Sequence, residues 1–168
     1  MSDEQELEYR VRVITDRQTG KPLQECWLCP HGVDGFHRDH GPAELDWDAD
    51  SGVVIREGYW QFGRRHRDNG PAFIRRDPES GKVTSKSWIH HGRLHREDGK
   101  PALQEIDPET GVIFREEYHE KGKPHRLDGP ALITRDRKTG EVVWSAADYD
   151  DDDDLAANIP PAHDMLEP

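Results

Sequence analysis

The sequence has few apolar residues: 32% of its 168 residues are hydrophobic, whereas 35% are charged. Ordinary globular proteins are about 45–50% apolar when glycine is included. A thick two-layer core is therefore not expected. The length fits one domain, and we expect a thin, repetitive sheet with much of its surface in solvent.

The chain also lacks the segments that direct proteins to membranes or out of the cell. No apolar run approaches the roughly 18 residues of a membrane span. The acidic start has neither the basic region nor the apolar core of a signal peptide. Two cysteines, Cys26 and Cys29, are too few for a disulfide scaffold. These absences favour a cytoplasmic protein with no membrane partner.

An excess of basic charge is missing as well, and the net charge is −12. Of the 35 acidic residues, 4 lie in residues 1–8 and 8 in residues 148–168, which leaves 23 to balance the 23 Lys and Arg. A neutral fold without a basic patch predicts no nucleic-acid partner. We divide the chain into an acidic tail (1–8), a repeat domain (9–147) and an acidic tail (148–168) expected to be disordered.

What the sequence does contain is a repeat. The phrase His-Arg-x-(Asp/Asn/His)-Gly-Pro-Ala occurs four times, once with a lysine before the proline, and its histidines are 29, 29 and 30 residues apart. Asp-x-x-(Ser/Thr)-Gly occurs five times between Asp16 and Gly140. Such a period indicates a repeat architecture. We interpret these residues of the first phrase as structural turns: His37, Arg38, Gly41, His66, Arg67, Asp68, Gly70, His95, Arg96, Asp98, Gly99, His125, Arg126, Asp128 and Gly129.

The segments between the turns have the length and composition of strands. They are enriched in Val, Ile, Phe, Trp and Tyr, which favours strands over helices. None sustains the 3.6-residue period of a helix. We predict an all-β fold, an antiparallel meander of about ten strands built from 29–30-residue β-hairpin units. The sheet is expected to be elongated and twisted, or partly curled.

Aromatic residues recur in step with the turns. Seven residues after successive turn glycines stand Trp27, Tyr59, Trp88 and Tyr118, followed by Ala147 in the last unit. Stacked units would align them on one face of the sheet. We call these four aromatic residues the aromatic column. We expect it to form the core, with the last unit acting as a cap.

One stretch of this repeat resembles a known family. Trp60 to His66, WQFGRRH, has the spacing Trp-x-x-Gly-x-x-His found in MORN repeats, and WIHHGRLH and YHEKGKPH are similar with one more residue before the glycine. The resemblance covers about residues 20–145. It implies β-hairpin units in an elongated single-layer sheet and a non-enzymatic role: protein scaffolding, sometimes lipid association, and in bacterial variants an antitoxin-like role.

The sequence departs from ordinary MORN units in two ways. Its units are longer than the usual two dozen or so residues, and His-Arg-x-Asp-Gly-Pro-Ala replaces the usual Gly-x-Gly after the histidine. It is similar to variant units of bacterial, phage and giant-virus proteins. A fold without net positive charge argues against lipid binding.

The four His-Arg pairs invite a catalytic interpretation, since a histidine near a carboxylate can act as a general base. Catalysis needs one constellation assembled once, whereas these pairs recur in every unit. We therefore expect a structural ladder, with each imidazole bonded to a backbone carbonyl and each guanidinium paired with a turn aspartate or a neighbouring acid. No catalytic residue, enzyme activity or cofactor is predicted.

A metal site remains as an alternative from another functional class. Cys26, Cys29, His31 and His40 form the only cluster of soft ligands outside the repeat, and zinc is held by such sets. Against it, residues three apart on a strand face opposite sides. His90, His91 and His95 form a second group, which we set aside because His95 is a repeat position.

The leading hypothesis is a binding module that docks on another protein. Residues that differ between units would set its specificity, and the acidic tail would attract a partner with a basic surface. The closest specific version is a small inhibitor, such as an antitoxin, an immunity protein or a phage counter-defence protein. The candidate partner-binding residues are Arg64, Arg65, Arg93, Leu94, Asp150, Asp151, Asp152, Asp153 and Asp154.

Overall fold

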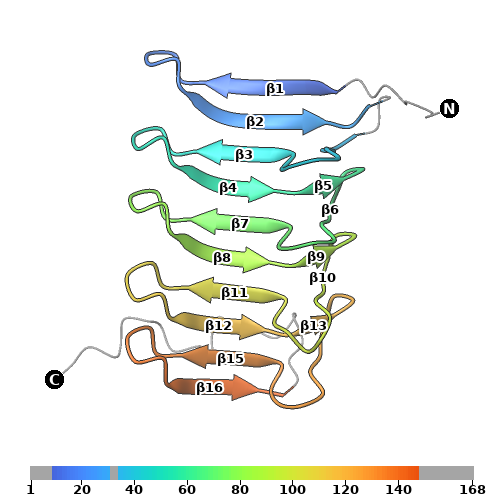
Figure 1. Ribbon diagram of the computed structural model, residues 1–168, viewed down its shortest axis with the longest axis vertical. Coiled ribbons are helices and arrows are strands. Elements are labelled where there is room, and N and C mark those ends of the chain that lie inside the picture. Colours follow the sequence, from blue (N-terminus) through green and yellow to red (C-terminus); the bar gives the residue numbers. More distant parts are fainter. Residues whose placement is uncertain (1–8, 31–33, 148–168) are drawn as a thin grey trace.

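The computed structural model describes residues 9–30 and 34–147, none of which lies in an α-helix. One ten-stranded antiparallel sheet has the order β1-β2-β3-β4-β7-β8-β11-β12-β15-β16 (Figure 1). Because the order is linear, β1 and β16 are the edge strands and the sheet is not closed into a barrel. The predicted all-β meander is confirmed. No helix within the described residues is long and apolar enough to span a membrane.

The main strands are short, as expected from the spacing of the turns. They are β1 (Arg10–Thr15), β2 (Pro22–Leu28), β3 (Glu44–Trp47), β4 (Val54–Gly58), β7 (Phe73–Arg76), β8 (Val83–Ser87), β11 (Leu103–Ile106), β12 (Ile113–Glu117), β15 (Leu132–Arg135) and β16 (Val142–Ala146). Each Asp-x-x-(Ser/Thr)-Gly phrase joins two of them. In the β7–β8 turn, one Asp77 carboxylate oxygen accepts the Ser80 N–H and hydroxyl, both at 2.7 Å. This bonding closes the turn locally.

The connection that follows the second strand of a full unit is itself a small hairpin, which the repeat period did not reveal. In the first, both Phe62 (φ 47°) and Gly63 (φ 76°) are left-handed, the conformation of a type I′ turn. The small hairpins lie together at the end of the sheet opposite the Asp-x-x-(Ser/Thr)-Gly turns (Figure 1). Their strands are β5 (Trp60–Gln61) with β6 (Arg64–Arg65), β9 (Ile89–His90) with β10 (Arg93–Leu94), and β13 (His119–Glu120) with β14 (Lys123–Pro124).

Side chains of the first small hairpin cover one face of the sheet. Strand pairing aligns Cys26, Glu44, Gly58 and Phe73 across β2, β3, β4 and β7. All four are buried. The Trp60 indole donates to a Glu44 carboxylate oxygen at 3.1 Å, and the Arg65 guanidinium lies 4.0 Å from the centroid of the Phe73 ring. The first small hairpin thus closes over this row.

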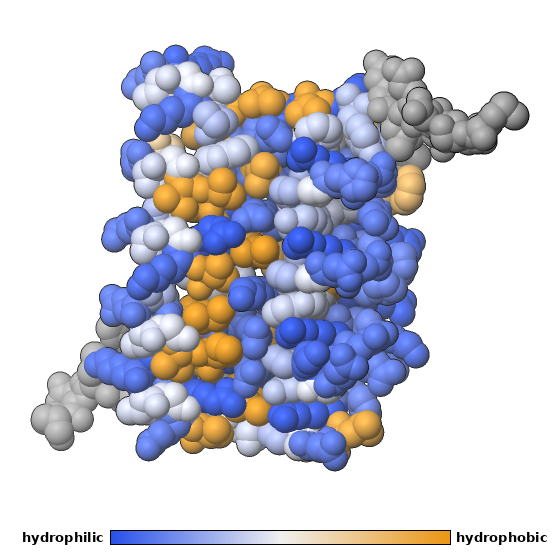
Figure 2. Space-filling view, viewed as in Figure 1, coloured by the Kyte–Doolittle hydropathy of each residue, from blue (hydrophilic) through white to orange (hydrophobic). Residues whose placement is uncertain are grey.

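The opposite face carries the aromatic column. Trp27 and Tyr59 donate their backbone N–H to the carbonyls of Ala43 and Ala72, both at 2.8 Å, so aromatic and alanine residues alternate across neighbouring strands. The alanines of the four Pro-Ala phrases are fully buried, whereas of the column only Tyr118 is buried. The small side chains make room for the large ones. Figure 2 shows hydrophobic residues gathered along the long axis of the sheet between more hydrophilic margins.

Candidate functional site

The arginines of the repeated phrase stack on the aromatic column. The guanidinium carbons of Arg38, Arg67, Arg96 and Arg126 lie 3.9, 3.8, 3.6 and 4.0 Å from the ring centroids of Trp27, Tyr59, Trp88 and Tyr118. Each guanidinium also donates to the carbonyl of the proline in its own phrase, at 3.0 to 3.4 Å. The expectation that these arginines pair with acids was wrong. The planar guanidinium cation is attracted to the negative face of the aromatic ring, and it covers that face.

Three of the four histidines of the phrase act as acceptors between units, and the fourth, His125, lies 3.7 Å from Glu120 instead. His37 Nδ1 accepts the backbone N–H of Phe62 at 3.3 Å, and His66 Nδ1 accepts that of His91 at 3.2 Å. His95 does the same with Lys121 at 3.3 Å. The expected bond to a backbone carbonyl was therefore wrong. The left-handed tip of each small hairpin has its N–H turned toward the preceding unit, where a histidine Nδ1 accepts it.

Backbone hydrogen bonds reinforce these contacts between neighbouring units, which we call junctions. The N–H groups of Gly63, Gly92 and Gly122 donate to the carbonyls of Phe36, Arg65 and Leu94 of the preceding unit, at 3.0, 2.8 and 2.8 Å. Each small hairpin is thus hydrogen-bonded to the unit before it. The first three His-Arg pairs belong to these junctions, which accounts for their recurrence from unit to unit.

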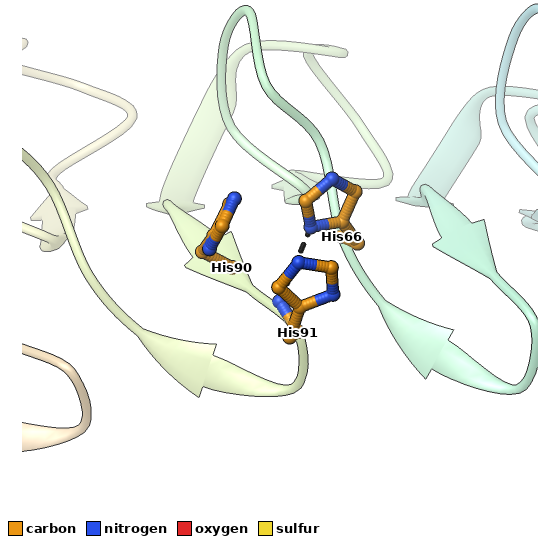
Figure 3. A group of neighbouring side chains, drawn as sticks. All are labelled: His66, His90 and His91. Atoms are coloured by element: carbon orange, nitrogen blue, oxygen red, sulfur yellow. Dashed lines mark hydrogen bonds between the residues drawn. The ribbon is translucent and has the colours of Figure 1, made fainter.

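One junction differs from the others because it gathers three histidines (Figure 3). The His66, His90 and His91 ring centroids lie 4.3 to 4.5 Å apart. His66 is 4% exposed, and His90 and His91 are exposed. Burial lowers the pKa of His66, with His90 and His91 adding to the shift and Asp68 opposing it. The neutral form of His66 is therefore favoured.

This group could not be recognised directly in the sequence, because it joins residues of two units. It suggested grouping His90 and His91 with His95, whose ring lies 6.1 Å from that of His90. The nearer partner, His66, precedes His91 by 25 positions. Only alignment of the hairpin tips with the histidines one unit earlier would have found it.

A second cluster of polar side chains lies where β12 meets the third small hairpin. Glu117 Oε1 accepts from Arg115 Nε at 2.7 Å, and Glu117 Oε2 lies 3.0 Å from His119 Nε2. A buried carboxylate and imidazole are the elements of acid–base chemistry. Here the arginine engages the same carboxylate, so we assign the group to the interior as a paired charge network.

The predicted cysteine cluster is only partly described. Cys26 and Cys29 are free thiols, each 0% exposed, while His40 is exposed. His31 lies outside the described residues. Burial raises the pKa of Cys26, which favours the neutral thiol over the thiolate that binds metal. Within the described ranges, neither cysteine belongs to a group of three metal-ligating side chains.

The candidate partner-binding residues have different environments. Arg64 and Arg93 are exposed on the small hairpins, and Leu94 is half-buried beside them. Arg65 lies 3.4 Å from Glu44 and stacks over Phe73, so we assign it to the interior instead. Asp150 to Asp154 lie outside the described residues.

Comparisons of the chain with models of protein families, with curated proteins and with solved structures returned no match.

Proposed function

We propose that this chain is a non-enzymatic module that binds another protein through the row of small-hairpin tips. The proposal rests on one observation, which is that the repeated and the variable residues of each unit lie in different places. The repeated residues face the junctions between units, as the arginine stacks and histidine acceptors show. The positions that change from unit to unit stand in solvent at the tips.

The three small-hairpin tips have the same backbone conformation but carry different side chains. Phe62, His91 and Lys121 occupy equivalent left-handed positions. The Phe62 and Lys121 side chains are 65% and 79% exposed, and His91 is exposed. Leu127, in the last His-Arg turn, is 86% exposed. Each unit adds two strands, and neighbouring strands lie about 4.8 Å apart, so successive tips would be about 9 to 10 Å apart. A partner surface with matching spacing would meet a different side chain at each step.

The resemblance to MORN repeats supports a binding role, as does the acidic tail at Asp150 to Asp154, which suits a basic partner. Within this class we favour a small inhibitor, of the antitoxin, immunity or counter-defence type. Such proteins act by occupying a partner's surface and need no catalytic residues.

The test is affinity capture from the native host with three full-length proteins. The tip variant carries Phe62→Ser and Lys121→Ser, and the control carries Arg17→Ser and Lys138→Ser in turns at the other end of the sheet. The proposal expects a partner whose recovery falls at least tenfold with the tip variant and is unchanged with the control. Equal recovery with all three proteins would refute a tip-mediated contact. Capture by residues 1–147 compared with the full chain then measures what the tail adds.

A further inference from the structure

We propose that His66, His90, His91 and Asp68 form a binding site for a divalent transition-metal cation of the zinc class, at the junction between two units. The side-chain ligand atoms of the three histidines all lie within 4.8 Å of one another. Asp68 adds a carboxylate oxygen 3.1 Å from His66 Nε2 and 3.7 Å from His90 Nε2. Imidazole ligands suit zinc and its neighbours in the first transition row.

The hydrogen bonding fixes which nitrogen of His66 is available. Because Nδ1 accepts the His91 backbone N–H, the proton of the neutral ring is on Nε2. A neutral imidazole binds a cation through its unprotonated nitrogen, so the ion would take the place of the His91 N–H at Nδ1. Nε2 would keep its proton, and Asp68 Oδ1, 3.1 Å away, can accept it. A carboxylate that accepts from the second ring nitrogen orients many metal-binding histidines.

The distances suit an ion after a small adjustment. Two ligands that are each about 2.0–2.1 Å from zinc, at a tetrahedral angle, are about 3.3 Å apart. The ligand atoms of the three histidines lie within 4.8 Å of one another, so each pair needs to approach by no more than about 1.5 Å. His90 is 46% exposed and His91 is exposed, so their side chains can adjust. His66 is the buried ligand, and the other two histidines close around the ion.

The site is particular to this junction. At the preceding junction, the positions of His90 and His91 are occupied by Gln61 and Phe62 above His37. At the following one they are Glu120 and Lys121 above His95. Among the described residues, His66, His90 and His91 form the only group of three or more metal-ligating side chains within this range. The backbone frame recurs, but the ligand set occurs once.

The neighbouring junctions supply matched variants for the test. His90→Gln with His91→Phe copies a hairpin the fold already accommodates, and Glu120→Gln with Lys121→Phe makes the same change one unit later. The chelator-treated full-length chain is titrated with Zn²⁺ alone by calorimetry. We expect one equivalent bound by the wild type and by the Glu120/Lys121 variant, with at least tenfold weaker binding by the His90/His91 variant. The aspartates of the tail are present in all three and cancel in the comparison.

Cobalt(II) separates this site from the cysteine pair. We expect visible d–d bands without a thiolate charge-transfer band, and loss of these bands in the His90/His91 variant but not in Cys26→Ser with Cys29→Ser. Equal Zn²⁺ uptake by the wild type and the His90/His91 variant would overturn the proposal. So would loss of the bound equivalent in the cysteine variant alone.

Discussion

The guanidinium of Arg96 lies 3.6 Å from the ring centroid of Trp88 and donates to the Pro101 carbonyl at 3.1 Å. The same geometry recurs in the other three copies of the phrase, where the ring distances are 3.8 to 4.0 Å. Burial lowers the pKa of Arg96, yet the group stays charged at neutral pH. This contact holds the His-Arg turn against the sheet.

Replacing Arg96 by lysine should destabilise the fold even though the charge is kept. An ammonium group cannot lie flat on the indole and reach the proline carbonyl at once. Cation–π contacts contribute about 0.5–2 kcal/mol, so we expect a loss of about 1 kcal/mol. Urea unfolding followed by tryptophan fluorescence measures it. Arg64→Lys, at an exposed hairpin position, is the control and should leave the midpoint in place. Equal midpoints for both variants would count against the stack.

The carboxylates of the Asp-x-x-(Ser/Thr)-Gly turns should make stability fall in acid. At Asp48, the N–H and hydroxyl of Ser51 and the N–H of Asp50 hold the pKa of the carboxyl below its ordinary value. The unfolded chain has a pKa of about 4 at this group. The contribution of the Asp48 carboxylate to the free energy of unfolding is therefore complete above about pH 4. It is lost as the pH falls through the pKa of this group in the folded protein.

Comparison of Asp48→Asn with Asp50→Asn isolates the contribution of the Asp48 carboxylate charge within one turn. Asparagine keeps an acceptor oxygen but has no charge to lose, so the stability difference between wild type and Asp48→Asn should shrink as the pH falls from 6 to 3. Asp50 contributes its N–H and not its carboxylate to the turn, so Asp50→Asn should follow the wild-type curve. Thermal unfolding at a series of pH values gives both curves. A difference for Asp48→Asn that does not change with pH would rule out the carboxylate charge.

The fold could be predicted from the sequence because its signals are local and periodic. Two turn phrases at a fixed spacing, with β-branched and aromatic residues between them, specify a meander of hairpins. The small hairpins were missed because each strand has only two residues, as in Trp60–Gln61 and Arg64–Arg65. Two residues are too few to show the alternation of apolar and polar side chains that identifies a strand.

The junctions could not be predicted because their contacts cross between units. The bond from the His91 N–H to His66 joins residues 25 apart, and depends on a left-handed tip whose φ is 50°. A carbonyl or acid partner was the natural expectation from residue type alone. The stack of arginine on the aromatic column was equally hidden, since Arg96 and Trp88 belong to separate segments of their unit.

Both thiols should be unreactive in the folded protein. Cys26 and Cys29 are each 0% exposed, and burial raises the pKa of Cys26, so little thiolate is available to attack a reagent. We expect an aromatic disulfide reagent to modify them slowly in native buffer and two thiols per chain at once in denaturant. Addition of a chelator should leave the native rate unchanged. Rapid reaction only after chelation would instead indicate that a metal protects the pair, as the cysteine-based alternative requires.

The tips of two small hairpins should respond unequally to the same substitution. Gly63 and Gly92 occupy equivalent positions with φ of 76° and 82°, so alanine at either incurs a similar left-handed strain of about 1–2 kcal/mol. Around Gly92 an added Cβ meets nothing within 4 Å, whereas at Gly63 it would lie 2.9 Å from the Asp34 carbonyl oxygen.

Gly63→Ala should therefore destabilise the protein by about 1 kcal/mol or more beyond Gly92→Ala, because the backbone must shift to relieve the contact. Chemical denaturation of the two variants in parallel gives the difference directly, since the strain common to both cancels. Equal losses would show that the first hairpin does not pack against Asp34 in solution. A larger loss at Gly63 would establish that the first small hairpin is docked on the preceding unit, as its histidine junction requires.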